Sequence, residues 1–291
     1  MKKILAVLLA CSMLFAFAAC GGNNEETTTT AAPKTTVAEE TTAADVTEAP
    51  VADETTTEAA ADETTTVAGE ETTAAAAPAT TEEIVAYFNT AINSAKKDSK
   101  SIHSNFMKHS VAGEITGIPG WLEFLIPGSP EKFVGGFMGE DKKKANVTWS
   151  SAEDKNAFFP VENETWASKL TADDVMRATC TPSADGKTYT IKITTKADDK
   201  SENVKHGQGH APKAFNVVLP ATISDNIPGF LSSVGTAAMN YPSSTVVVKV
   251  DVATGHVLTA NYLLYWTINL PVKDAVVVLP FSTENDYVIN W

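Results

Sequence analysis

The C-terminal third of the chain alternates apolar and polar residues over a length typical of extended strands. Valines occupy every second position from Val246 to Val252. After a turn at residues 251–256, the alternation resumes at Leu258 and continues to Leu270. Because successive side chains of a strand point to opposite faces, this pattern predicts a long β-hairpin with one apolar face. That face needs a cover, so the rest of the domain has to supply a second layer.

Further β-rich runs predict that this hairpin belongs to a larger, mainly antiparallel sheet. Residues 176–181 and 188–196 predict a second hairpin around a turn at 184–187. Short strands are expected at 145–150, 215–219, 275–281 and 286–291, with a polar loop at 197–212. Long alternating strands that are joined by tight turns favour an antiparallel, curved sheet.

The predicted covering layer is a helix from residue 81 to residue 98. Thr80 followed by Glu83 forms a capping-box pattern, and lysines gather at the far end, where cations suit the helix dipole. Five apolar residues recur at helical spacing: Ile84, Val85, Phe88, Ile92 and Ala95. A second helix is expected at 227–239. The sequence therefore predicts an α+β fold in which an N-terminal helix packs on the sheet.

Residues 21–80 have a composition unlike that of the rest of the chain. They are rich in Thr, Ala and Glu, contain no aromatic residue, and carry thirteen acidic residues against Lys34 alone. Such a segment buries too little apolar surface to offset the entropy of ordering, so we expect a disordered linker. Most of the net charge of −14 lies in this linker, which gives no support to nucleic-acid binding. The expected domains are 1–20, 21–80 and 81–291.

The first twenty residues have the layout of an export signal. Lys2 and Lys3 precede an apolar run from Ile4 to Ala19, which is shorter than the roughly 20 residues of a membrane-spanning helix. The run ends in Phe17-Ala18-Ala19-Cys20 and resembles bacterial lipoprotein signal peptides. That resemblance implies a diacylated Cys20, an extracytoplasmic domain and an anchor in the membrane of a bacterium with a Gram-positive envelope. A rival lipobox at Cys11 and an ordinary cleaved signal are the alternatives.

The passage from Val246 to Leu270, with its Asp-x-x-Thr-Gly turn, resembles lipoprotein carriers of the LolA and LppX type. In that family a curved antiparallel half-barrel wraps a helix and leaves a cleft for an apolar ligand. The whole layout is also similar to surface lipoproteins of Firmicutes, a grouping that implies no particular activity.

Apolar stretches that are broken by Pro and Gly supply a candidate ligand lining. The phrase Ile-Pro-Gly-aromatic-Leu occurs at 118–122 and again at 227–231. Five aromatic residues in and around these stretches are the candidate lining: Trp121, Phe124, Phe133, Phe137 and Phe230. The alternative is that these side chains fill the core between helix and sheet.

The sequence carries no recognised catalytic, cofactor or metal signature. His206 and His210 are four residues apart, but the glycines between them favour a solvated loop over a metal site. Cys180 is the only cysteine of the expected domain, which favours a small buried side chain over a reactive thiol.

These observations predict a non-catalytic lipoprotein domain that binds an apolar ligand or another component of the cell envelope. The alternative is a structural or adhesive display module whose core is filled by its own side chains and whose partner is a protein or a glycan. The sequence leaves the oligomeric state open.

Overall fold

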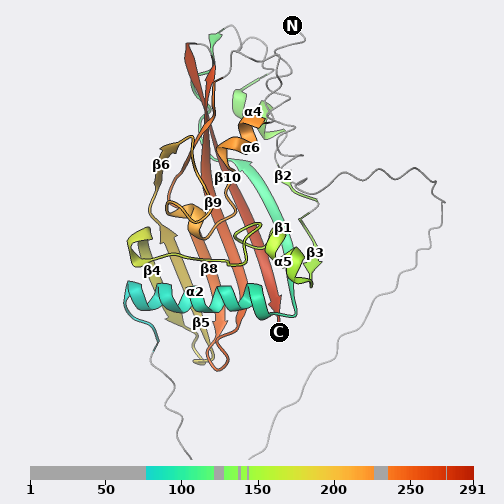
Figure 1. Cartoon of the computed structure of the whole chain (residues 1–291), viewed down its shortest axis with the longest axis vertical. Coiled ribbons are helices and arrows are strands. Elements are labelled where there is room, and N and C mark those ends of the chain that lie inside the picture. The colour runs from blue at the N-terminus through green and yellow to red at the C-terminus, as the bar shows by residue number, and fades with distance from the viewer. Residues whose placement is uncertain (1–76, 121–127, 137–138, 143, 226–234, 273) are drawn as a thin grey trace, which may run out of the picture. The chain divides into compact units, whose positions relative to one another are not determined.

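The computed structural model describes residues 77–291 except 121–127, 137–138, 143, 226–234 and 273. The described residues form an α+β fold in which an N-terminal helix packs on a ten-stranded, mainly antiparallel sheet (Figure 1). The predicted α+β class, with an N-terminal helix on a mainly antiparallel sheet, is therefore confirmed.

The helices and short 3-10 turns lie between the strands along the chain. The helical elements are α2 (Thr81–Asp98), α4 (Pro130–Gly135), α5 (Ala152–Phe158), η1 (Ala172–Asp174), η2 (Ala211–Lys213) and α6 (Pro220–Asp225). The strands are β1 (Ser101–Val111), β2 (Gly139–Glu140), β3 (Val147–Trp149), β4 (Val175–Pro182), β5 (Thr188–Thr195), β6 (Asp198–Ser201), β7 (Ala238–Tyr241), β8 (Thr245–Asp251), β9 (Val257–Val272) and β10 (Ala275–Asn290).

The hairpin of β9 and β10 is the centre of the sheet. Each of its strands has 16 residues, and they pair from Ala275 opposite Val272 to Val288 opposite Thr259. The strand order is β2-β1-β10-β9-β8-β5-β4, with β3 added to β1 and the pair β6–β7 added to β9. The sheet is neither closed nor strongly curled, so the half-barrel curvature expected from the sequence is not confirmed.

The helix α2 begins and ends where the sequence predicts. The Thr80 hydroxyl accepts a hydrogen bond from the Glu83 amide at 3.2 Å, and the Glu83 carboxylate accepts bonds from the amides of Ala79 and Thr80. These bonds satisfy amides that the first helical turn leaves without partners. The apolar stripe of α2 then lies on the sheet, and Phe88 and Ile92 are fully buried.

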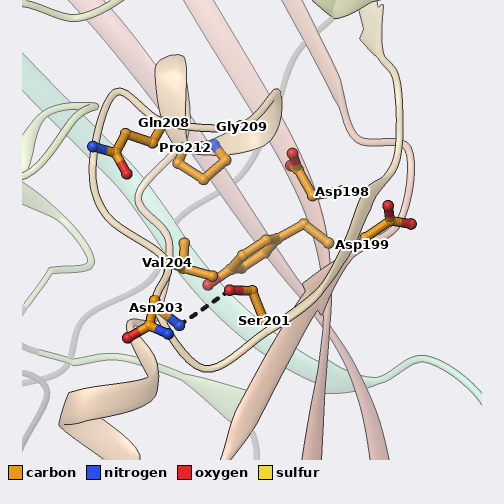
Figure 2. A pocket seen from close by; sticks show the side chains of 9 residues that line it. Asp198, Asp199, Ser201, Asn203, Val204, Gln208, Gly209 and Pro212 are labelled. Atoms are coloured by element: carbon orange, nitrogen blue, oxygen red, sulfur yellow. Dashed lines mark hydrogen bonds between the residues drawn. The ribbon is translucent and has the colours of Figure 1, made fainter.

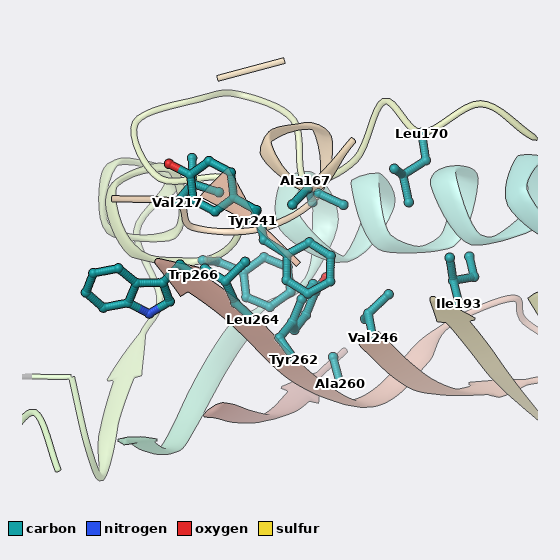
Figure 3. Packing of buried hydrophobic residues seen from close by; sticks show 14 of the residues in the cluster. Ala167, Leu170, Ile193, Val217, Tyr241, Val246, Ala260, Tyr262, Leu264 and Trp266 are labelled. Atoms are coloured by element: carbon teal, nitrogen blue, oxygen red, sulfur yellow. The ribbon is translucent and has the colours of Figure 1, made fainter. Parts of the chain in front are cut away.

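Aromatic rings fill the space between the covering layer and the sheet. Phe159 stands edge-on to Tyr287 with ring centroids 5.1 Å apart, and Phe215 stands edge-on to Tyr262 at 5.5 Å. Figure 3 shows Tyr262 among neighbours from β5, β8 and β9, with α2 above them. All four rings are buried, and edge-to-face pairs of this kind add about 0.5–1.5 kcal/mol each to the gain from burial.

A polar stripe on α2 binds the backbone of the segment that follows α5. The Asn93 side-chain oxygen accepts bonds from the amides of Ala167 and Ser168 at 2.6 and 3.0 Å. The Asn89 side-chain amide donates to the Leu170 carbonyl at 2.7 Å. These contacts hold residues 159–170, which we call the strap, along the helix.

Lys96 completes this stripe from a buried position. Its ammonium group donates to the carbonyls of Phe159, Val161 and Trp166 at 3.0, 2.7 and 3.3 Å. Burial lowers the pKa of Lys96 to about 7, and Glu162 and Glu164 oppose that shift. The three carbonyl oxygens also favour the charged amine, because each accepts one of its three protons.

Three predicted element assignments were wrong, two predicted strands form one strand, and β1 was missed. The strands expected at 275–281 and 286–291 are joined in β10, which ends at Asn290, because the polar residues at 282–286 pair with β9 and with β1. Residues 215–219 form no strand, and the expected polar loop at 197–212 contains the strand β6. Met239 lies in β7 rather than at the end of a helix, because it pairs with Ile268 of β9.

Candidate functional site

A surface pocket lies between the β6–β7 pair and the loop from Glu202 to Lys213. Its volume is about 220 Å³. Figure 2 shows the side chains around it, which come from both the strands and the loop. The lining residues are Asp198, Asp199, Ser201, Asn203, Val204, Gln208, Gly209, Pro212 and Tyr241.

The loop wall of the pocket is fixed by Asp198. One oxygen of its carboxylate accepts a hydrogen bond from the His210 amide at 2.6 Å, and the other accepts one from the Ala211 amide at 2.8 Å. Gly209 has φ +87°, and a Cβ at this position would lie 2.5 Å from the Asp198 Oδ1 atom. The loop therefore needs glycine here, both for its backbone angle and for the close carboxylate.

Tyr241 lines the inner part of the pocket. It is fully buried, and its hydroxyl donates to the Val218 carbonyl at 2.6 Å. Burial, together with the nearby charge of Asp198, raises the pKa of Tyr241 well above its ordinary value, so the hydroxyl keeps its proton. Its neighbours in the lining include Pro212, which is also buried, whereas Asp199, Asn203 and Gln208 are exposed.

Asp174 anchors the same loop from the other side. Its carboxylate accepts two hydrogen bonds from the Lys213 ammonium group, at 2.7 and 2.9 Å. It also accepts bonds from the Thr171 amide and hydroxyl, at 2.8 Å each. One carboxylate oxygen lies 2.9 Å from His210 Nδ1. Burial alone would raise the pKa of Asp174, but the bonds from Lys213, His210 and Thr171 outweigh it and give a pKa of about 2. The loop is thus held by two carboxylates, one from β6 and one from η1.

Asp174 and His210 are paired as a carboxylate and a general base are in some active sites. Here, however, another side chain already binds the Asp174 carboxylate. Lys213 neutralises the Asp174 carboxylate, which weakens the effect of that charge on the His210 ring. Within the described residues, neither side chain contacts a serine or cysteine that a base would activate. The geometry is that of an anchor for the loop.

The two histidines of the loop have different surroundings. His210 lies against Asp174, whereas His206 is half-buried near Glu162, Glu164 and Lys96, and burial lowers its pKa. The predicted loop at these residues is confirmed. Across the part of the chain that the structure describes, no group of three or more His, Cys, Asp or Glu side chains is arranged to hold a metal ion.

The structure does not describe the side chains of the predicted ligand-lining residues. Four of the five aromatic residues, Trp121, Phe124, Phe137 and Phe230, lie outside the described residues, as does Cys20. The backbone of Phe133 lies in α4, but its side chain is also outside the described part. The membership of these residues in a site therefore stays a prediction.

Cys180 is partly buried and packs against the core. Burial raises the pKa of its thiol. This position agrees with the expectation of a small side chain that contributes to packing.

The sequence contained one signal for the pocket. The sequence predicts a polar loop at 197–212, and within it the two glycines of His-Gly-Gln-Gly-His mark sites with positive φ, at +75° for Gly207 and +87° for Gly209. A loop that repeats this conformation twice needs fixed partners. The groups that hold this loop, Asp174 and Asp198, lie twelve or more residues before the atoms they bind, so local pattern does not reveal them.

Comparisons with known proteins assign the chain to no family. No family model, no curated protein and no solved structure matches it. Among the described residues, no helix combines the length and the apolar character that crossing a membrane requires.

Proposed function

We propose that this protein is an extracytoplasmic lipoprotein that is anchored to the membrane through Cys20 and binds a component of the cell envelope. The domain acts without catalysis, and the pocket beside β6 and β7 receives a hydroxyl-rich ligand such as a glycan. The observation that carries this proposal is the lining of a small, rigidly built pocket. The anchor rests on the resemblance of residues 1–20 to a lipoprotein signal.

The chemistry of the lining suits a saccharide unit. Exposed Asp199, Asn203 and Gln208 supply donors and acceptors for the hydroxyls of a sugar, and half-buried Val204 supplies apolar surface for its C–H face. Pockets for drug-sized ligands have volumes of roughly 300–1,000 Å³. A cavity of about 220 Å³ is smaller, so it suits one sugar unit of a longer polymer.

The packed core argues against a ligand between α2 and the sheet. The rings of Phe159, Phe215, Tyr262 and Tyr287 occupy that space in the described structure. An apolar ligand would therefore have to use the aromatic residues at 121–137 and Phe230. We therefore favour a display module with a glycan partner over a lipid carrier.

The test is a titration of the full-length lipoprotein, in detergent, with soluble peptidoglycan and wall-polymer fragments. Isothermal titration should give saturable binding, and the double variant Asn203→Ala/Gln208→Ala should weaken it at least about tenfold, since two hydrogen bonds are worth about 1–3 kcal/mol. Lys205→Ala is the matched control, because Lys205 is exposed on the same loop but does not line the pocket.

Two results would contradict the proposal. One is equal binding by the double variant and the control, which would move the site elsewhere. The other is a bound lipid in native mass spectra with no uptake of any glycan fragment, which would favour the carrier function.

A further inference from the structure

Three cations form a diagonal row on the sheet face that points away from α2. Lys249 of β8 pairs with Thr190 of β5, and Lys192 follows two residues later on β5. Lys192 pairs in turn with Thr179 of β4, and Arg177 stands two residues before Thr179. Diagonal neighbours in a sheet lie roughly 7–8 Å apart. We call Arg177, Lys192 and Lys249 the basic stripe.

The side chains of the basic stripe are open to solvent. Lys192 stands between Ile191 and Ile193, which are buried in the core, so its own side chain faces outward. The strand register puts Arg177 and Lys249 on the same outer face. All three cations are exposed, and none forms an ion pair with another described residue.

Each cation has a threonine directly opposite on the neighbouring strand: Arg177 and Thr194, Lys192 and Thr179, Lys249 and Thr190. The Cβ atoms of such partners lie roughly 4.5–5.5 Å apart, so a charge and a hydroxyl can bind the same small anion. The Thr194 hydroxyl also lies 3.2 Å from that of Thr245. Only one of these two hydroxyls donates to the other, so one hydrogen stays available to a ligand. The stripe therefore repeats one anion-binding unit three times.

Two acidic residues lie near the Lys249 end of the stripe. Asp251 follows Lys249 by two residues, and its carboxylate accepts bonds from the Thr254 amide and hydroxyl at 2.9 and 2.7 Å. Asp185, in the turn between β4 and β5, accepts a bond from the Ser183 hydroxyl at 2.6 Å and interacts with Lys249 at longer range. The attraction for an anion is therefore strongest at the other two cations of the stripe.

We propose that the basic stripe binds a linear polymer of phosphodiester-linked polyols, with three consecutive phosphates on its three cation–threonine pairs. The planar guanidinium of Arg177 can bind two oxygens of one phosphate, and the lysines supply point charges. The presence of such a polymer beside the domain rests on the proposed envelope location, whereas the binding itself does not.

The spacing of the phosphates fits the stripe. In poly(glycerol phosphate), six bonds join consecutive phosphorus atoms. Six bonds also join the Cα atoms of residues i and i+2, which lie roughly 6.6–6.8 Å apart in a strand. This distance is close to the roughly 7–8 Å between diagonal neighbours, so each phosphate can meet its own cation.

The surroundings of the stripe favour such a polymer over a nucleic acid. Proteins bind single-stranded nucleic acids largely by stacking the bases on aromatic rings. Among the described residues of β4, β5 and β8 that face outward, none is aromatic. A flexible chain without bases therefore matches the available groups better.

Fluorescence anisotropy of a dye-labelled, short poly(glycerol phosphate), titrated with the full-length lipoprotein in a neutral detergent, tests this proposal. Three phosphate contacts predict a slope of about −2 for log affinity against log salt, or a loss of roughly fifteenfold between 50 and 200 mM NaCl. In Arg177→Gln/Lys249→Gln, which keeps one of the three cations, the affinity should fall at least about tenfold at low salt and the slope should approach −0.7. Thr179→Val/Thr190→Val removes hydroxyls but no charge, so it should weaken binding about threefold without changing the slope.

Lys132→Gln/Lys142→Gln is the control, because it makes the same change of charge at exposed lysines outside the stripe. This control and the pocket variant Asn203→Ala/Gln208→Ala should both bind the polymer as the natural protein does. Equal loss in the stripe variant and the control, an affinity that the threonine variant leaves unchanged, or binding insensitive to salt would overturn the proposal. Tighter binding of oligothymidylate of the same charge would also overturn it. Loss in the pocket variant alone would place the polymer in the pocket, which would contradict this inference but support the proposed function.

Discussion

Lysines on the two faces of the sheet have opposite environments. Lys96 and Lys155 are buried in the covering layer and are bound by backbone carbonyls, with Lys155 donating to the Ser99 carbonyl at 2.6 Å. Lys192 and Lys249 stand on the outer face and have water around them. Lysines on the inner face therefore join segments of the chain, whereas lysines on the outer face are available to bind a charged partner. Changes on the inner face should alter stability, and changes on the outer face should alter binding.

The largest expected difference is between a core ring and an outer lysine. Phe159→Ala should lower the free energy of unfolding by about 3–5 kcal/mol, because it leaves a cavity beside Tyr262 and Tyr287. Lys192→Ala should change it by less than about 0.5 kcal/mol. Urea denaturation followed by circular dichroism measures both, and similar losses for the two variants would break the comparison.

A smaller effect is expected at the buried carboxylate that anchors the pocket loop. Asp174→Asn should lower the free energy of unfolding by about 1–3 kcal/mol at neutral pH, because it removes charge-assisted bonds from Lys213 and His210. Because the pKa of Asp174 is about 2, below its unfolded value, its stabilisation is present at neutral pH and is lost as pH falls from about 4 to about 2.

The free energy of unfolding, measured as a function of pH at its acid end (the acid limb), reports this effect. The loss between pH 4 and pH 2 should be smaller in Asp174→Asn than in the natural protein. Asp199→Asn is the control, because Asp199 is exposed, and it should keep the natural acid limb. An unchanged limb in Asp174→Asn would show that this carboxylate does not anchor the loop.

The last expected effect is a slope with pH to which buried Lys96 contributes and an exposed lysine does not. The pKa of Lys96 is about 7 in the folded state and near 10.4 when unfolded. The unfolded chain therefore binds more protons between these values, so stability should rise with pH from about 7 to about 9. Lys96→Met should flatten this rise, and Lys192→Met should retain it. The same slope in both variants, measured by urea denaturation, would contradict the assignment to Lys96.

The sequence predicted the parts of the fold that local pattern determines. The capping residues Thr80 and Glu83 and the apolar stripe determine α2, and alternation determines β8 and β9. The strap and its polar stripe were not predicted, because Asn93 and Lys96 bind backbone that lies more than sixty residues away. Residues 215–219 have the composition of a strand, but they form no strand in the sheet.

The candidate site was predicted less well, for the same physical reason. Its loop depends on Asp174 and Asp198, which bind groups 12 to 39 residues away in the sequence, so local pattern does not mark them. The expected lining was assigned by hydrophobicity, which does not distinguish a ligand pocket from a packed core. The rings of Phe159, Phe215, Tyr262 and Tyr287 belong to the packed core.

Hydrogen exchange of the full-length lipoprotein, with and without saturating glycan fragments of the envelope, tests the central claim most directly. The account predicts slower exchange of amides in residues 198–212, with the amides of α2 and of the β9–β10 hairpin unchanged. Slower exchange confined to residues 117–139, or protection that appears only when a lipid is added, would contradict it.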